Sequence, residues 1–112
     1  MITIEKLKEL GADVTNGVAR CAGNEDFYIK MVTMALNDNS LEALTEAIEN
    51  KDLDAAFERA HSMKGVLGNV SLTNVFDPVS EMTEELRVRN DIDYSGYLAT
   101  IKEELEKYRA LL

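Results

Sequence analysis

The sequence of 112 residues predicts an all-α protein, an antiparallel up-and-down four-helix bundle with short additional N-terminal helices. Apolar residues recur every three or four positions along almost the whole chain, which is the spacing of one helix face. The alternation of apolar and polar residues that marks a half-buried strand is absent. The breaks between the periodic segments carry residues that commonly begin or end helices, and the chain has a single proline.

Two short helices are expected at the N-terminus. Thr3 can cap the first helix, Gly11 can end it, and Asp13 can cap the second. Gly23 and Asn24 then turn the chain. The apolar residues expected to face the core from these two helices are Ile4, Leu7, Leu10, Val14, Val18 and Cys21.

A third helix is expected to run up to the polar group 37–40, and a fourth to end near Asn50. Asn39 and Glu42 have capping-box spacing at the start of the fourth helix, and Asp52 can cap the fifth. We interpret the apolar stripes and all five methionines as core. The apolar residues of the third and fourth helices are Phe27, Met31, Val32, Met34, Leu41, Leu44 and Ile48.

The sixth helical segment contains Pro78, and two interpretations are open. Either Asp77 caps a new helix with Pro78 in its first position, or one helix from about Leu72 continues and bends where the proline removes a backbone donor. We favour the continuous, bent helix. Its apolar residues are Leu72, Val75, Phe76, Val79, Met82 and Leu86.

The last helix is expected to begin at Asp91 or Asp93 and to carry a Glu103–Lys107 pair on its outer side. Short polar connections imply that neighbouring helices run antiparallel, and the four longest helices then make the bundle. No linker or repeat divides the chain, so residues 1–112 are expected to form one domain. The apolar side of the last helix contains Tyr94, Tyr97, Leu98, Ile101, Leu105 and Tyr108.

Composition excludes several classes of function. Hydrophobic residues make up 46% of the chain and charged residues 29%, which is typical of a soluble helical protein. No stretch approaches the roughly 18 apolar residues of a membrane span, and the N-terminus lacks the basic and apolar regions of a signal peptide. We therefore expect a cytoplasmic protein with no membrane partner.

The net charge of −9 argues against nucleic acid as a partner, because the twelve Lys and Arg residues are spread thinly. Cys21 is the only cysteine, which excludes an internal disulfide and a cysteine-based metal cluster, and we interpret it as a small buried hydrophobe. One histidine without cysteines also argues against a metal site.

His61 is the only histidine, and its neighbours are unusual. Lys64, Gly65 and Gly68 follow it at i+3, i+4 and i+7, within roughly 60° of it on a helix that advances about 100° per residue. Each glycine in a helix interior costs about 1 kcal/mol relative to alanine. Clearance around the imidazole for another protein would explain that cost. The neighbouring face, with Leu53, Ala56, Ala60, Met63, Leu67 and Val70, is the expected core side.

Structural explanations for the same residues stay open. A lone histidine is usually structural or merely exposed, the glycines could permit close helix packing, and Lys64 could be a solvated surface lysine. Arg59, His61 and Lys64 nevertheless form a small basic group in an acidic chain.

The stretch Ala60–Asn69, AHSMKGVLGN, resembles the phosphoacceptor motif of histidine phosphotransfer (HPt) domains. The motif typically reads alanine, histidine, serine or threonine, an aliphatic residue, lysine, glycine, two small or apolar residues, then glycine. Only Met63 and Leu67 are mild variants, and the resemblance extends over nearly the whole helical chain. Ser71 stands where a further glycine is common.

The resemblance implies a stand-alone bacterial phosphorelay carrier. In such domains the histidine accepts a phosphoryl group from the aspartyl phosphate of a receiver domain and donates it to another receiver's aspartate. It also implies response-regulator receivers as partners, with a histidine kinase as a further possible partner, and magnesium supplied by the receiver. The chain itself has no phosphate-binding glycine loop and no carboxylate cluster for magnesium, so we expect no cofactor and no autokinase activity.

The residues near His61 can be given roles on this basis. An exposed imidazole is largely neutral at cellular pH and offers a nitrogen lone pair to phosphorus, and Lys64 can place a positive charge near the phosphoryl oxygens. The residues expected to contact the partner are Phe57, Arg59, Ser62, Gly65 and Gly68.

In many family members a Gln or Glu on the next helix bonds the other ring nitrogen, and alignment puts Thr83 at that position. Three possibilities remain: Thr83 orients the ring, Glu84 substitutes, or the contact is absent. Taken alone, Thr83 reads as an ordinary surface residue. The alternative function is a non-catalytic helical adaptor that binds receivers without phosphotransfer; in either case we expect a monomer.

Overall fold

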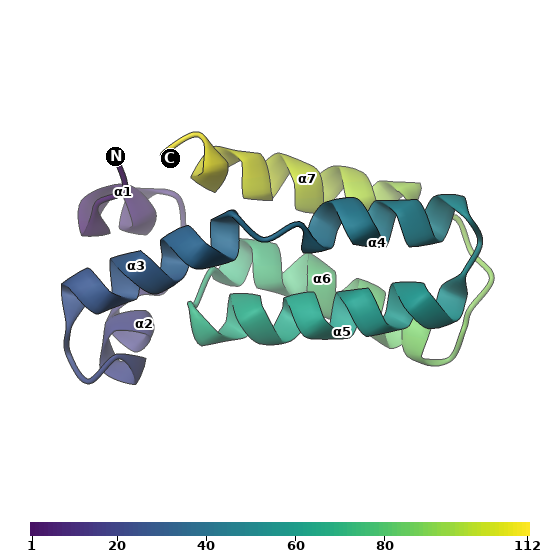
Figure 1. Ribbon diagram of the computed structural model, residues 1–112, viewed down its shortest axis with the longest axis horizontal. Helices are drawn as coiled ribbons and strands as arrows, with labels where there is room; N and C mark the ends of the chain where they lie inside the picture. Colours follow the sequence, from purple (N-terminus) through teal and green to yellow (C-terminus); the bar gives the residue numbers. More distant parts are fainter.

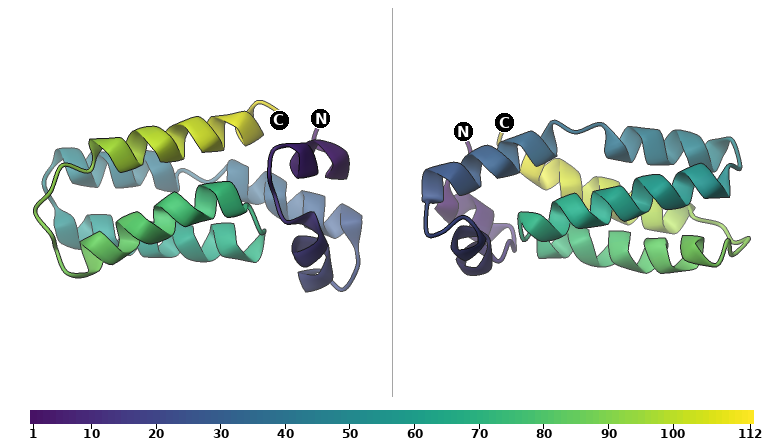
Figure 2. Two further views of the ribbon diagram at one scale, coloured as in Figure 1. Left: turned by 180° about the vertical axis from the view of Figure 1, so that it is seen from behind. Right: turned by 60° about the horizontal axis from the view of Figure 1, so that its bottom comes forward.

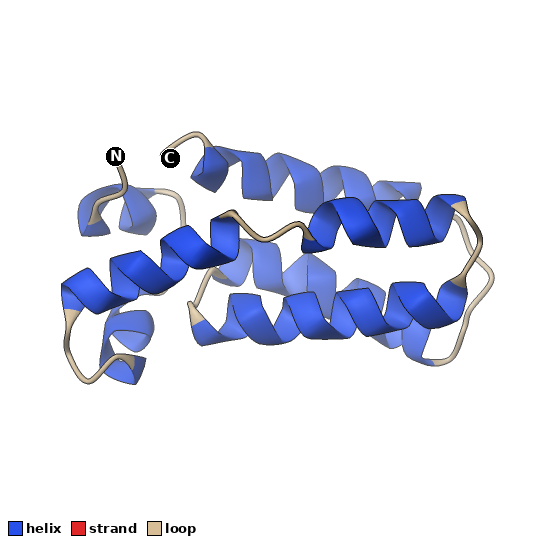
Figure 3. Cartoon of the chain, viewed as in Figure 1, coloured by secondary structure: helices blue, strands red, loops and turns tan.

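The computed structural model describes all residues 1–112 and contains seven α-helices and no strand (Figures 1 and 3). The prediction of an all-α fold is therefore confirmed. None of the seven helices combines the length and the hydropathy that a membrane span requires. The helices are α1 (Ile4–Glu9), α2 (Val14–Arg20), α3 (Glu25–Leu36), α4 (Ser40–Glu49), α5 (Leu53–Asn69), α6 (Thr73–Arg87) and α7 (Ser95–Arg109).

Helices α4 to α7 form the long part of the molecule. α5 packs against α4 and α6, and α6 packs against α7. The chain reverses direction at each connection between these four helices (Figure 1). Arg109 joins α7 to the turn between α3 and α4, because its guanidinium donates to the carbonyls of Leu36 and Asp38 and pairs with Glu42 at 2.8 Å.

Helices α1 and α2 gather with α3 at one end of the molecule (Figure 2). The Tyr28 hydroxyl on α3 donates to the Val70 carbonyl at 2.8 Å, and the Asp13 amide donates to the Ser71 carbonyl at 2.9 Å. The N-terminal helices are thereby fastened to the end of α5. Predicted caps are present at Thr3, Asp13 and Asp52, whose side chains accept from backbone amides three residues on.

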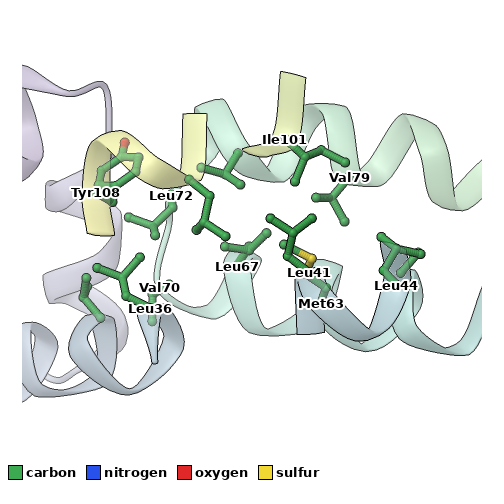
Figure 4. Close-up of a cluster of buried hydrophobic side chains, with 14 of the residues drawn as sticks. Leu36, Leu41, Leu44, Met63, Leu67, Val70, Leu72, Val79, Ile101 and Tyr108 are labelled. Carbon is green, nitrogen blue, oxygen red and sulfur yellow. The ribbon is translucent and has the colours of Figure 1, made fainter. Parts of the chain in front are cut away.

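The core lies between the helices of the long part, and Figure 4 shows one cluster of its side chains. Met63 and Leu67 of α5 meet Leu41 of α4 and Leu105 of α7 around one small internal space. Most apolar positions predicted as core are buried or partly buried, as the 3.6-residue period requires.

The predicted core side of α3 is partly wrong. Phe27 and Met34 are exposed, at 47% and 58%, as is Met1, whereas Tyr28, Val32 and Leu36 are buried. Both sets have helical spacing, so periodicity alone could not choose between them. The large Tyr28 fills the contact with α2 and decides which face turns inward.

Two local predictions, one at a helix end and one at a helix surface, are also wrong. Asn39 makes no side-chain cap to α4; the Asp38 carboxylate instead accepts from Ser40 Oγ at 2.5 Å. Lys107 pairs with Glu104 at 3.0 Å and not with Glu103, so the pair has i+3 spacing in place of the expected i+4.

Pro78 lies inside a continuous α6, so Asp77 does not cap a new helix. Helix α7 begins at Ser95, after the Asp91 or Asp93 start that the sequence predicts, and Tyr94 is the residue before it. The Asp93 carboxylate accepts from the Ser95 amide at 2.9 Å.

Four helices end in a residue with positive φ that is not glycine. These residues are Ala22, Lys51, Ser71 and Arg89, with φ between 52° and 56°. A left-handed residue after a helix lets its amide and the next one bond the last carbonyls, as Arg89 and Asn90 do with Leu86 and Glu85.

Candidate functional site

His61 lies in the middle of α5 with its side chain exposed. Ala60 and Met63 on either side of it are buried in the core, which fixes how the helix is turned. Because residues on an α-helix advance about 100° each, this anchoring directs His61 to solvent. The imidazole makes no hydrogen bond to another residue, and the residue is exposed.

The two glycines beside His61 differ in their surroundings. A Cβ at Gly65 would meet no heavy atom within 4 Å, so this glycine opens the surface one turn after the histidine. A Cβ at Gly68 would lie 3.2 Å from the Phe76 ring of α6. Gly65 provides the expected clearance, whereas Gly68 also permits close packing between α5 and α6.

Lys64 is half-buried one turn from His61 and takes part in none of the four ion pairs. The pKa of the Glu84 carboxyl lies below its ordinary value, first because Arg87 donates a hydrogen bond to it and further because it lies near Arg87, Lys64 and His61. Glu84 on α6 is therefore within electrostatic reach of both α5 residues.

Thr83 does not reach His61. Its side chain is fully buried, and its hydroxyl donates to the Val79 carbonyl at 2.7 Å within α6. The interpretation of Thr83 as an ordinary surface residue is therefore wrong, and the structure gives no contact through which it could orient the imidazole. Glu84 accepts from Arg87 Nε at 2.8 Å and likewise makes no hydrogen bond to His61.

Phe57 contacts the imidazole directly. It lies one turn before His61, and the two rings are stacked with centroids 5.7 Å apart and planes 21° apart. The guanidinium carbons of Arg87 and Arg89 lie 5.1 Å and 4.8 Å from the centroid of the Phe57 ring. Sequence reasoning missed both arginines, since they are far from His61 along the chain.

Arg59 and Ser62 are exposed but lie farther around α5 than the glycines. Arg59 points about 160° away from His61, so it does not form a basic group with His61 and Lys64. The basic residues near the imidazole's stacking partner come instead from α6 and the turn after it. Arg59 and His61 are two residues apart, and residues at this spacing do not share a face of a helix.

No group of three or more His, Cys, Asp or Glu side chains lies close enough together to hold a metal ion. A hollow of about 370 Å³ is lined mainly by residues of α3 and the C-terminal part of α5, including Met31, Met34 and Val66. His61 is not among its lining residues.

Comparison with known families gives one match. The family model described as Hpt domain matches residues 32–111, which include the end of α3 and all of α4 to α7. No curated protein and no solved structure matches the chain. The matched segment contains His61, Lys64, both neighbouring glycines and the arginines around Phe57.

Proposed function

The chain belongs to the Hpt domain family, and we propose that it relays a phosphoryl group between receiver-domain aspartates through a phosphohistidine at His61. Hpt domains are phosphocarriers of phosphorelays. The observation that carries the proposal for this residue is the exposed, unbonded imidazole of the chain's only histidine, beside an open glycine.

The transfer needs little beyond a neutral imidazole. A ring nitrogen lone pair attacks the phosphorus of the aspartyl phosphate, an N–P bond forms, and the O–P bond breaks to release the carboxylate. The proton on the other ring nitrogen stays there, so the product is a protonated phosphoimidazole. The reverse sequence passes the group to a second aspartate. Attacking and leaving atoms must lie roughly in line, which makes positioning and access the carrier's main tasks.

Lys64 and Gly65 support these tasks. The ammonium of Lys64, one turn from His61 and free of ion pairs, can approach the phosphoryl oxygens as a point charge. The open surface at Gly65 admits a receiver. The magnesium ion belongs to the receiver in this proposal, since none of the carrier's acidic residues are grouped to hold one.

Incubation with a receiver carrying a labelled aspartyl phosphate tests the proposal. The expected result is label on the carrier that survives base, is lost in acid and is absent from His61→Gln. The variant should keep its helical content and its free energy of unfolding, because the removed ring is exposed. An adaptor without phosphotransfer would bind the receiver and acquire no label.

Two further results would contradict the assignment of His61 as the acceptor of a carrier without kinase activity. Label acquired from ATP in the absence of any other protein would contradict a pure carrier and indicate an autokinase. Label that persists in His61→Gln would place the acceptor elsewhere.

Lys64→Ala tests the role of the ammonium. We expect slower transfer or a shorter phosphohistidine lifetime, by about tenfold, with receiver affinity largely retained. Equal rates and lifetimes in Lys64→Ala and the unchanged protein would make Lys64 a bystander.

A further inference from the structure

The imidazole of His61 lacks a polar orienting contact. Thr83 is buried and bonded to Val79, and the Glu84 carboxylate is paired with Arg87. An exposed side chain without such a contact can exchange between rotamers, yet an in-line transfer requires the attacking nitrogen to be aimed. Another contact must therefore restrict the ring if transfer is efficient.

The Phe57 ring provides such a contact. The centroid separation of 5.7 Å and the interplanar angle of 21° fall in the range of an offset stack. Phe57 and His61 are four residues apart on α5, which is the spacing of side chains that meet on one helix face. A stack covers a face of the imidazole and leaves both nitrogens at its edge free, so it restricts the ring without consuming the nucleophilic lone pair.

Phe57 is itself held in place from the next helix and its turn. The Arg89 guanidinium lies 4.8 Å from the ring centroid, and its Nε donates to Asp54 of α5 at 2.6 Å. The Arg87 guanidinium lies 5.1 Å from the centroid and is fixed by Glu84 at 2.8 Å. The ring also packs against the edge of the core. Two anchored cations thus limit how the phenyl ring can move.

We propose that Phe57, held by Arg87 and Arg89, is the positioning residue of His61 and sets the orientation in which the imidazole meets the phosphoryl group. This inference rests on the proposed function. It gives Phe57 a role inside the carrier in place of the partner contact expected from its sequence position. The face of the Phe57 ring restricts the orientation of the imidazole in place of a hydrogen bond from α6.

Proton NMR of the imidazole provides a direct test, because the only histidine gives the only imidazole signals. Phe57→Leu should remove the ring-current displacement of these signals, and Phe57→Tyr should restore it. Phe27→Leu is the matched control, since Phe27 is an exposed phenylalanine on α3. Imidazole signals that are the same in Phe57→Leu and the unchanged protein would overturn the stack.

Phosphotransfer kinetics test the consequence. With saturating labelled receiver, Phe57→Leu should lower the transfer rate constant about tenfold and change receiver affinity less than about twofold, because orientation is lost and the surface stays open. Phe57→Tyr should recover the rate. A loss of affinity with an unchanged rate constant would make Phe57 a docking residue and overturn the proposal.

Arg89→Gly tests whether Arg89 holds the Phe57 ring, and it also removes the hydrogen bonds of the guanidinium to the Leu86 and Arg87 carbonyls. Arg89 has φ 52°, a conformation that glycine adopts without strain, so the substitution removes the guanidinium and suits the backbone. We expect the rate constant to fall about threefold. Lys51→Gly, at φ 55° after α4, is the matched control and should leave the rate unchanged. Equal rates in both variants would overturn the role of Arg89.

The two proposals fail in different ways. If the unchanged protein acquires no label, the proposed function fails, while the NMR comparison still decides whether Phe57 orients His61. If the unchanged protein is labelled and Phe57→Leu transfers at the same rate, only the positioning role fails. Should Phe57→Leu prove unfolded by circular dichroism, Arg89→Gly compared with Lys51→Gly tests the same role of Phe57.

Discussion

Gly17 in α2 and Gly65 in α5 are both helical glycines, and their surroundings are opposite. A Cβ at Gly17 would lie 2.3 Å from Cε1 of Tyr28, whereas a Cβ at Gly65 would meet nothing within 4 Å. The first glycine lets α2 and α3 approach each other, and the second keeps a surface open beside His61. The same loss of helix propensity, about 1 kcal/mol relative to alanine, serves packing in one place and access in the other.

The contrast extends to the regions around the two glycines. Around Gly17, Tyr28 is buried and bonded to Val70, and Ser71 donates to Asn16 at 2.9 Å. Around Gly65, the polar side chains lie at the surface and His61 makes no hydrogen bond. The Hpt match begins at residue 32, so Gly17 and Tyr28 lie outside it, whereas Gly65 and His61 lie inside. The close-packed glycine and the glycine at an open surface therefore lie in different parts of the chain.

A large side chain at Gly65 is the strongest test of the contrast between Gly17 and Gly65, because destabilisation of the fold by it would contradict an open surface there. Gly65→Arg should lower receiver affinity about 100-fold or more, because a long side chain occupies the open surface. Its free energy of unfolding should rise by up to about 1 kcal/mol, since arginine favours the helix more than glycine does. Binding titration and urea unfolding measure the two effects.

Gly65→Ala should show the same gain in stability with a much smaller loss of affinity. A Gly65→Arg carrier that binds receivers as tightly as before would remove Gly65 from the docking surface.

Gly17→Ala should have the opposite signature. The new methyl group forces Tyr28 to move and weakens its bond to Val70, so we expect a loss of about 2–3 kcal/mol in the free energy of unfolding. Urea unfolding checks this. Gly96→Ala is the control, because a Cβ there meets nothing within 4 Å and should stabilise α7 slightly. If Gly17→Ala and the unchanged protein had equal free energies of unfolding, Tyr28 could move away from the new methyl group at no cost.

Alkaline pH should lower the free energy of unfolding through two buried tyrosines, Tyr28 beside Gly17 and Tyr108 on α7. Burial raises the pKa of Tyr28 and of Tyr108 to about 12, above the value near 10 of an unfolded tyrosine. Their contribution to stability is complete below about pH 10 and is lost as pH rises through about 12, by roughly 1–2 kcal/mol for each tyrosine. Unfolding measured across this interval should depend less on pH in Tyr28→Phe; an unchanged dependence would contradict the burial of the hydroxyl.

Gly68 should fall between the two extremes and show the smallest effect. Alanine favours the helix, but its methyl group would press on the Phe76 ring at 3.2 Å. These terms oppose each other, so Gly68→Ala should change the free energy of unfolding by less than about 0.5 kcal/mol. A loss as large as that of Gly17→Ala would show that Phe76 cannot move.

Sequence reasoning identified the features that depend on neighbours along the chain. The helices, the caps at Thr3, Asp13 and Asp52, and the exposed stripe at His61 all follow from spacing within one helix. The continuous α6 through Pro78 was also predicted.

The features that depend on packing between helices could not be predicted in this way. The inward turn of Tyr28 follows from its contact with Gly17, and the burial of Thr83 from the packing of α6. Arg87 and Arg89 reach Phe57 only because α5 and α6 lie side by side. Each of these contacts joins residues on two different elements, and a pattern within one element contains no information about it.

The four left-handed residues at the ends of α2, α4, α5 and α6 leave the protein a margin for thermostabilisation. An L-residue in this conformation costs roughly 1 kcal/mol or more, which glycine would recover. Ala22 and Lys51 can be exchanged on this ground alone. Ser71 and Arg89 form hydrogen bonds through their side chains, with Asn16 and Asp54, so a more heat-resistant carrier is best engineered from the first two positions.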